Sequence, residues 1–340
     1  MPPLLHRSTR PIPATSNPEN LNPNRASSRL PNFRDDTDSH NLLQPFGRLL
    51  RIQISLVIEA GRGARKRILP LRSLQGARML VNINGSATRY VLSNEGGGPW
   101  LTFIHQLGGD LSVWDQLAGY FRDEYTVLRY DVRGHGKTAV SGKPFSVGDL
   151  SDDLATLLDA LDAPTTHLVG MSMGGMIAQQ FALDHPSRID HLTIADSTSG
   201  TPPEGRAVWD QRAHAARSGG IAALVPTTLS RWLTPDFQAA HPEAVEQIRD
   251  VLAHTLPEGY AMACEALRDF DVRSKLGSIR CPTLTVAGRH DPGTPPAMTR
   301  AIADAIEGAQ FELLDAAHLA PIEQSHRFAA LLETFLGRPV

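Results

Sequence analysis

The sequence predicts an α/β protein whose doubly wound, mostly parallel sheet carries an inserted helical cap. Three observations lead to this fold class. Short apolar runs alternate with amphipathic stretches from residue 79 onward, as buried parallel strands alternate with the helices that cover them. The 340 residues are 41% apolar, which is enough to bury a large core. A segment far longer than a usual crossover separates two of the apolar runs, which end at residue 195 and begin at residue 283.

The first expected elements form a hairpin. Residues Met79–Ile83 and Ala87–Leu92 alternate in hydropathy around Asn84-Gly85, a dipeptide typical of a two-residue turn. The runs that follow are continuous rather than alternating, which favours strands buried on both faces. In chain order, these strands are expected at Trp100–Ile104, Thr126–Tyr130, His167–Met171, His191–Ala195, Thr283–Ala287 and Phe311–Leu314.

Helices are expected between these strands. Ser146, with Asp149 three residues later, forms a capping-box-like start for one of them. Five leucines then recur on one face of that helix, which predicts that this face packs on the sheet. We assign residues at about 200–275 to a helical cap over the carboxyl edge of the sheet. Residues 79–340 would then form one domain with its cap.

Residues 1–78 have a different composition. They carry 12 Arg and 1 Lys against 5 acidic residues, whereas residues 79–340 carry 20 basic and 31 acidic residues. Pro, Asn, Ser and Arg dominate the start without any periodicity, so we expect a disordered basic extension. An organelle transit peptide and a nucleic-acid-binding arm are two alternatives. We favour a third, an upstream extension from a misassigned start codon, with the working protein beginning at Met79.

The composition excludes several classes of function. Cys264 and Cys281 fit neither a disulfide framework nor a metal-ligand spacing, which favours a reducing compartment. No apolar run approaches the roughly 18–20 residues of a membrane span, and no secretory signal is present. An acidic domain repels nucleic acid. We therefore expect a cytoplasmic protein with a small-molecule substrate and neither nucleic acid nor membrane as partner. Its oligomeric state stays open.

The clearest chemical motif is Gly170-Met171-Ser172-Met173-Gly174. This G-x-S-x-G pattern directly follows a predicted strand and precedes an apolar helical stretch. A tight strand-to-helix turn needs small residues beside the serine and lifts its hydroxyl into the open. Ser172 is therefore the candidate nucleophile. The alternative is a Gly-rich turn with an idle serine.

A serine hydroxyl is a weak nucleophile at neutral pH, so it needs a base within hydrogen-bond reach. His318 follows the last predicted strand, where the catalytic histidine lies when the triad order is Ser, Asp, His. The acid that orients the imidazole must come from a separate loop. Asp291, after the penultimate strand, is the favoured candidate. Asp196, at the end of the strand before the cap, stays open as an assistant or a replacement.

Acyl transfer also needs two N–H donors aimed at the developing oxyanion. The backbone of Met173, immediately after the candidate nucleophile, would supply one. The backbone of Leu107, in the loop His105-Gln106-Leu107-Gly108-Gly109, would supply the other. The segment 131–136 is interpreted as structural, because it has no second ligand cluster and no G-x-G-x-x-G pattern. We expect neither a metal nor a cofactor.

These residues together carry a resemblance. From about Leu80 to Leu336 the chain resembles the α/β-hydrolase superfamily, and within it the bacterial 3-oxoadipate enol-lactonases. The wider superfamily is indicated by Asp-Val-Arg-Gly-His-Gly, by Gly-Met-Ser-Met-Gly-Gly-Met and by the two loops with Asp291 and His318. The lactonases are indicated by the segments 231–235, 256–260, 294–296 and 316–319. The loop 105–110 and Asp196 depart from the commoner family pattern.

The resemblance implies a serine hydrolase that opens a carboxylated enol-lactone in aromatic catabolism, through an acyl-enzyme. A carboxylated substrate needs a cation near the pocket, for which Arg212 and Arg231 are candidates, with Trp209 as an apolar wall. Two alternatives stay open. One is a carboxylesterase or cofactor-free perhydrolase acting on small uncharged acyl substrates. The other is a ligand-binding receptor with slow residual hydrolysis, because fold alone does not determine function.

Overall fold

The computed structural model describes residues 79–93, 97–140 and 142–337. The predicted extension at residues 1–78 lies outside this range, and the predictions made for it stay predictions. Among the helices of the described residues, none is long and apolar enough to cross a membrane.

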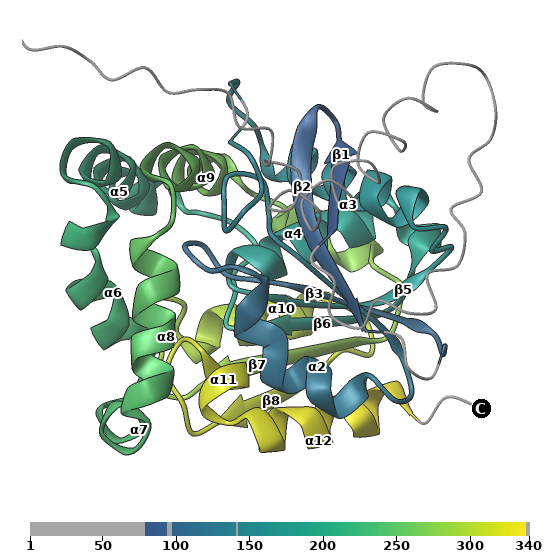
Figure 1. Cartoon of the computed structure of the whole chain (residues 1–340). Coiled ribbons are helices and arrows are strands. Elements are labelled where there is room, and N and C mark those ends of the chain that lie inside the picture. Colours follow the sequence, from purple (N-terminus) through teal and green to yellow (C-terminus); the bar gives the residue numbers. More distant parts are fainter. Residues whose placement is uncertain (1–78, 94–96, 141, 338–340) are drawn as a thin grey trace, which may run out of the picture. The chain divides into compact units, whose positions relative to one another are not determined.

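An eight-stranded sheet lies at the centre of the described residues (Figure 1). Its strand order is β1-β2-β4-β3-β5-β6-β7-β8. The pairs β1–β2 and β2–β4 are antiparallel, and the other pairs are parallel. The predicted fold class is therefore confirmed. The strands are β1 (Met79–Ile83), β2 (Ser86–Ser93), β3 (Trp100–Ile104), β4 (Thr126–Tyr130), β5 (Thr166–Met171), β6 (Ile189–Ala195), β7 (Thr283–Gly288) and β8 (Gln310–Leu314).

The hairpin turn has the conformation that its two residues favour. Asn84 and Gly85 have φ angles of 49° and 85°, the left-handed values that a tight hairpin turn requires and that Asn and Gly tolerate best. β1 and β2 pair in register on either side of this turn, with Ile83 opposite Ser86.

Helices cover both faces of the sheet. Figure 1 shows α2 and α12 in front of the strands and α3 and α4 behind them. α10 packs on β7 and β8. The bounds are α2 (Asp115–Phe121), α3 (Val147–Ala160), α4 (Met173–Asp184), α10 (Pro296–Ala305), α11 (Ala320–Glu323) and α12 (Ser325–Leu336). In α3 the predicted capping box is present: the Ser146 hydroxyl accepts from the Asp149 N–H, and the Asp149 carboxylate accepts from the Ser146 N–H.

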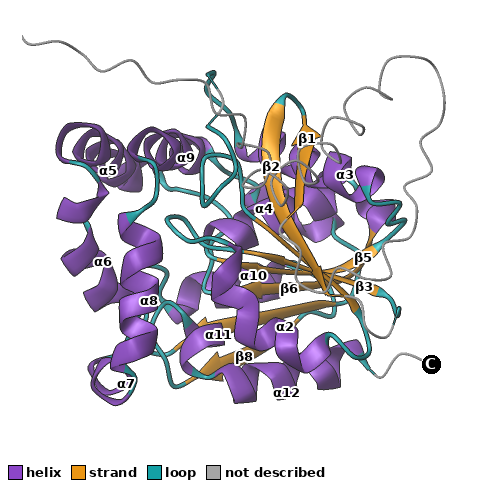
Figure 2. Ribbon diagram, viewed as in Figure 1, coloured by secondary structure: helices purple, strands orange, loops and turns teal. Residues whose placement is uncertain are grey.

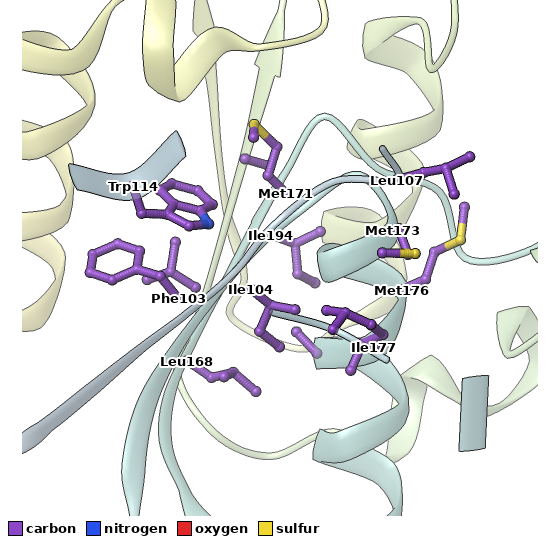
Figure 3. Close-up of a cluster of buried hydrophobic side chains, with 14 of the residues drawn as sticks. Phe103, Ile104, Leu107, Trp114, Leu168, Met171, Met173, Met176, Ile177 and Ile194 are labelled. Carbon is purple, nitrogen blue, oxygen red and sulfur yellow. The ribbon is translucent and has the colours of Figure 1, made fainter. Parts of the chain in front are cut away.

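The turn that follows β5 lies within the hydrophobic core. Met171 and Met173, the two residues that flank Ser172, are fully buried. Figure 3 draws them within a cluster that includes Ile104, Ile177 and Ile194, which come from two strands and α4. Burial of one such side chain contributes about 1.5–3 kcal/mol. The position of Ser172 is therefore held by packing on both sides of it.

The segment expected as a cap contains five helices. Figure 2 shows α5 to α9 grouped beyond one end of the strands. They are α5 (Arg206–Gly219), α6 (Val225–Trp232), α7 (Pro235–Ala240), α8 (Pro242–Ala253) and α9 (Pro257–Asp269). They meet the loops at the carboxyl ends of the strands: the Thr255 hydroxyl donates to the Gly108 carbonyl at 3.2 Å, and a Cβ on Gly134 would lie 2.8 Å from Gly259 Cα.

Candidate active site

The turn between β5 and α4 exposes one serine. Ser172 has φ 56° and ψ −116°, a conformation that L-residues rarely adopt, and its side chain is partly exposed while both neighbours are buried. A Cβ on Gly170 would lie 2.1 Å from the Gly174 carbonyl oxygen, and a Cβ on Gly174 would lie 2.2 Å from the Ile104 carbonyl oxygen. The glycines of the motif are therefore required by close backbone approach.

Three residues from three loops form one hydrogen-bonded chain. His318 Nε2 lies 2.9 Å from Ser172 Oγ, and His318 Nδ1 lies 2.7 Å from Asp291 Oδ2. The imidazole can take the serine proton at Nε2 while Nδ1–H donates to the carboxylate. This arrangement is able to generate a nucleophilic serine and to stabilise the imidazolium that results.

The surroundings of Asp291 keep it ionised. It is 4% exposed. Burial raises the pKa of this carboxyl, but the charge and hydrogen bond of His318, followed by hydrogen bonds from Thr294, outweigh burial and hold the pKa below its usual value. The Gly293 N–H and the Thr294 hydroxyl donate to it at 2.7 and 2.6 Å. A negative partner for the imidazolium is therefore present at neutral pH.

Asp196 lies near these three residues, but its carboxylate oxygens accept hydrogen bonds from backbone N–H groups. Oδ1 accepts from the Gly288 N–H at 2.7 Å and Oδ2 accepts from the Ala320 N–H at 3.0 Å. Asp196 is fully buried and has a φ of 46°. Burial and then the charge of Asp291 raise its pKa, against the opposing effect of the two N–H donors. One carboxyl group thus ties together the loops that carry Asp291 and His318.

The topology brings the predicted oxyanion donors to one place. β3 and β5 are neighbours in the sheet, with Ile104 opposite Gly170. The chain leaves β3 toward β4 on one side and leaves β5 toward β6 on the other, so the strand order reverses between them. A crevice at such a switch point is where open α/β sheets bind ligands. The Leu107 N–H donates no hydrogen bond to another described residue. Met173 is the first residue of α4, where an N–H has no partner within the helix.

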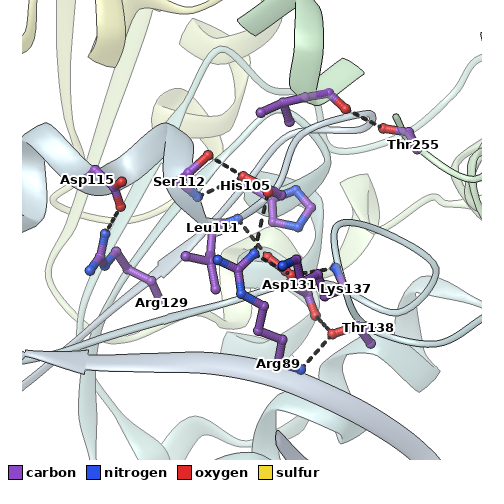
Figure 4. Close-up of polar contacts among 12 residues, drawn as sticks. Arg89, His105, Leu111, Ser112, Asp115, Arg129, Asp131, Lys137, Thr138 and Thr255 are labelled. Carbon is purple, nitrogen blue, oxygen red and sulfur yellow. Dashed lines mark hydrogen bonds and ion pairs between the residues drawn. The ribbon is translucent and has the colours of Figure 1, made fainter. Parts of the chain in front are cut away.

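A buried polar cluster supports the loop that follows β3 (Figure 4). Asp131 accepts from the N–H groups of Leu111 and Lys137 at 2.8 and 2.7 Å and from Arg89 Nη1 at 3.1 Å. His105 Nε2 accepts from the Val132 N–H at 3.0 Å. These contacts tie the loop after β4 to the loop after β3, in agreement with a structural role for residues 131–136.

His135 in this cluster makes stability depend on pH. Burial, and then the charge of His105, lower its pKa to about 3. Between about pH 6.5 and pH 3, His135 binds a proton in the unfolded chain but not in the native one. The free energy of unfolding therefore falls on acidification by about 1.4 kcal/mol per pH unit for this one group. His135→Phe should therefore flatten the pH dependence.

The measurement is urea unfolding of the full chain at pH 7.5, 6.5 and 5.5. His214→Phe, on the exposed surface of α5, is the control and should follow wild type. Equal slopes for wild type and His135→Phe would contradict this origin of the acid sensitivity.

Sequence reasoning did not assign a role to two residues at the site. Thr294 donates to Asp291, and its hydroxyl also lies 3.3 Å from His318 Nδ1. Glu323 accepts from the Ala317 N–H at 2.7 Å and from Thr234 of the cap at 2.5 Å. Thr294 follows Asp291 by three residues, and this spacing could have indicated the contact, because hydroxyl side chains often hydrogen-bond within short turns. Glu323 had no signal of this kind.

The predicted substrate-binding residues lie in the cap. Trp209 and Arg212 are on α5, with the Arg212 guanidinium 5.1 Å from the centre of the Trp209 ring. Arg231 is on α6, and its Nη2 lies 3.2 Å from the position of a Cβ on Gly293, in the loop that carries Asp291. Burial, followed by the charge of Arg212, lowers the pKa of Arg231. Arg231 therefore lies close to the loop of Asp291, and Arg212 is close enough to Arg231 to act on it electrostatically.

The chain is similar to known hydrolases over most of its described length. The family model of the alpha/beta hydrolase fold matches residues 99–325. The chain is 36% identical over 252 residues to 3-oxoadipate enol-lactonase 2 of Acinetobacter baylyi, which covers 74% of this chain and 94% of that protein.

Solved structures give the same result. The enol-lactonase from Burkholderia xenovorans LB400 is 35% identical with a TM-score of 0.73, over 76% of this chain and 99% of that one. A thermophilic esterase from Thermogutta terrifontis, solved with malate bound, is 28% identical with a TM-score of 0.71, over 76% and 98%. These matches show that the chain is a hydrolase and belongs to the α/β hydrolase fold family.

Proposed function

We propose that this enzyme opens a carboxylated enol-lactone of the 3-oxoadipate enol-lactone type, as part of aromatic compound catabolism. Two lines of support combine. The relatives with the highest identity among those described above are enol-lactonases, and the hydrogen-bonded chain of Ser172, His318 and Asp291 has the spacing that acyl transfer requires.

The proposed reaction begins with attack of Ser172 Oγ on the lactone carbonyl while His318 Nε2 takes the serine proton. The N–H groups of Leu107 and Met173 stabilise the oxyanion. Collapse of the tetrahedral intermediate breaks the ring C–O bond, and the enol oxygen leaves with the proton from His318. The enol then becomes a ketone. Water, deprotonated by His318, finally releases the open-chain acid from Ser172.

The observation that favours a carboxylated substrate is a pair of cations without an anion. Among the arginines of the described residues, Arg212 and Arg231 are the two that are partly buried and form no ion pair with a carboxylate. Two like charges in a partly desolvated place repel each other, so an anionic ligand between them is strongly favoured. The malate in the related esterase is a bound dicarboxylate of this general kind.

The test compares 3-oxoadipate enol-lactone with an uncharged aryl ester, p-nitrophenyl butyrate, for the full chain. Arg212→Ala and Arg231→Ala should each raise KM for the lactone by about 10- to 100-fold, because a hydrogen bond to a charged group is lost. Ester hydrolysis should change by less than about threefold, since the ester offers the cations no partner.

Arg206→Ala is the matched control, because Arg206 is an exposed arginine on the same helix as Arg212. It should behave as wild type with both substrates. A wild-type enzyme that hydrolyses the ester but leaves the lactone intact would instead support a carboxylesterase or perhydrolase with the same hydrogen-bonded chain.

A further inference from the structure

Tyr260 lies beside the loop that follows β3. It belongs to the first turns of α9, and its side chain is 2% exposed. Its ring approaches the loop that follows β3: a Cβ on Gly108 would lie 3.3 Å from Tyr260 Cε2 and 3.6 Å from Trp232 of α6. Because Gly108 adjoins Leu107, the Tyr260 side chain lies next to a proposed oxyanion donor.

The hydroxyl of Tyr260 has no hydrogen-bond partner among the described residues. A buried tyrosine hydroxyl usually has one, since leaving it unpaired costs free energy. Burial raises the pKa of this phenol, so it keeps its proton and can act as a donor. A phenol donor without an acceptor among the described residues, on a side chain that is otherwise buried, is suited to bind an oxygen of a small molecule.

The helices α5 and α9, which carry Arg212 and Tyr260, pack against each other. Arg217 of α5 binds Glu258 of α9 at 2.8 Å, and Arg268 of α9 binds Asp210 of α5 at 2.8 Å. These ion pairs hold the two antiparallel helices in register. Through these ion pairs, and through the shared approach of Tyr260 and Trp232 to Gly108, α5, α6 and α9 meet beside the loop that follows β3.

The electrostatics agree with this placement. After burial and the effect of Cys264, the charges of Arg212 and Arg231 act on the Tyr260 phenol and lower its pKa. Both guanidinium groups are therefore close enough to Tyr260 to interact with it. None of these three side chains has a carboxylate partner among the described residues.

We propose that the Tyr260 hydroxyl donates a hydrogen bond to the substrate carboxylate held by Arg212 and Arg231, which makes Tyr260 a specificity residue of this enzyme. The inference rests on the proposed function, because it requires a carboxylated substrate. It extends that function by adding a neutral donor on α9 to the two cations on α5 and α6.

Tyr260→Phe tests the inference because it removes only the hydroxyl. We expect KM for the enol-lactone, and the inhibition constant of adipate as a simple dicarboxylate probe, to rise about tenfold. We expect kcat for the lactone and kcat/KM for p-nitrophenyl butyrate to stay within about threefold of wild type. This separation excludes a general structural effect, which would lower turnover of both substrates.

Tyr130→Phe is the matched control. Tyr130 on β4 is also a buried tyrosine whose hydroxyl has no partner among the described residues, and its variant should bind adipate as wild type does. Equal loss with lactone and ester, or no change with either, would overturn the role of Tyr260 while the proposed function stands. A wild-type enzyme that neither opens the lactone nor binds adipate would refute both.

Discussion

Ser172→Ala should lower kcat for both the lactone and the aryl ester by about 10⁵-fold or more, since the nucleophile of a serine hydrolase acts as one unit with its base. The structure gives the reason: Ser172 Oγ lies 2.9 Å from His318 Nε2, at the top of a turn that close glycine contacts hold in place. Steady-state kinetics on the full chain measure this loss. His318→Ala should lower kcat about as much, and the double variant should lose little more.

Ser151→Ala is the control for Ser172→Ala. Ser151 is a fully buried serine of α3 whose hydroxyl has no partner among the described residues, and its variant should keep wild-type kinetics. If Ser172→Ala retained near-full activity, the nucleophile would have to be another group, and the mechanism proposed above would be wrong.

Asp291→Asn should lower kcat by about 10⁴-fold, because an amide in place of the carboxylate favours the wrong tautomer of the imidazole. The 2.7 Å contact between Asp291 Oδ2 and His318 Nδ1 is the basis of this expectation. Asp196→Asn should have a different effect. Its amide has one acceptor oxygen for two backbone donors, at Gly288 and Ala320.

The cost of an unpaired buried N–H, about 1–3 kcal/mol, should therefore appear as lost stability in Asp196→Asn, with kcat lowered by only about tenfold. Urea unfolding and lactone kinetics on the same two variants separate these outcomes. If Asp196→Asn lost as much kcat as Asp291→Asn, Asp196 would be the acid that serves His318, or would share that role.

The order of the elements could be predicted because each element has a local signal. The continuous apolar runs predicted the buried strands, Asn84-Gly85 predicted the hairpin turn, and Ser146 with Asp149 predicted the start of a helix. The bounds of the predicted strands agree with the structure to within two residues for the same reason. In the G-x-S-x-G motif the spacing itself encodes the close approach of Gly170 and Gly174 to neighbouring backbone.

The choice between Asp291 and Asp196 as the partner of His318 could not be made in this way. Both carboxylates follow strands that end at the same edge of the sheet, so chain order alone could only favour one of them. The structure distinguishes them, because the oxygens of Asp196 accept from backbone N–H groups while Asp291 faces the imidazole. Their catalytic roles stay predictions until the variants are measured.

The sequence by itself determined the fold class, the turn that presents Ser172 and the chain order in which acid and base follow it. Those features depend on residue periodicity and on contacts between near neighbours along the chain. Only the tertiary structure decided that the Tyr260 hydroxyl has no hydrogen-bond partner among the described residues, and that Glu323 joins the cap to the loop of His318. Such relations join residues far apart in the chain, and they arise only when the cap helices pack over the ends of the strands.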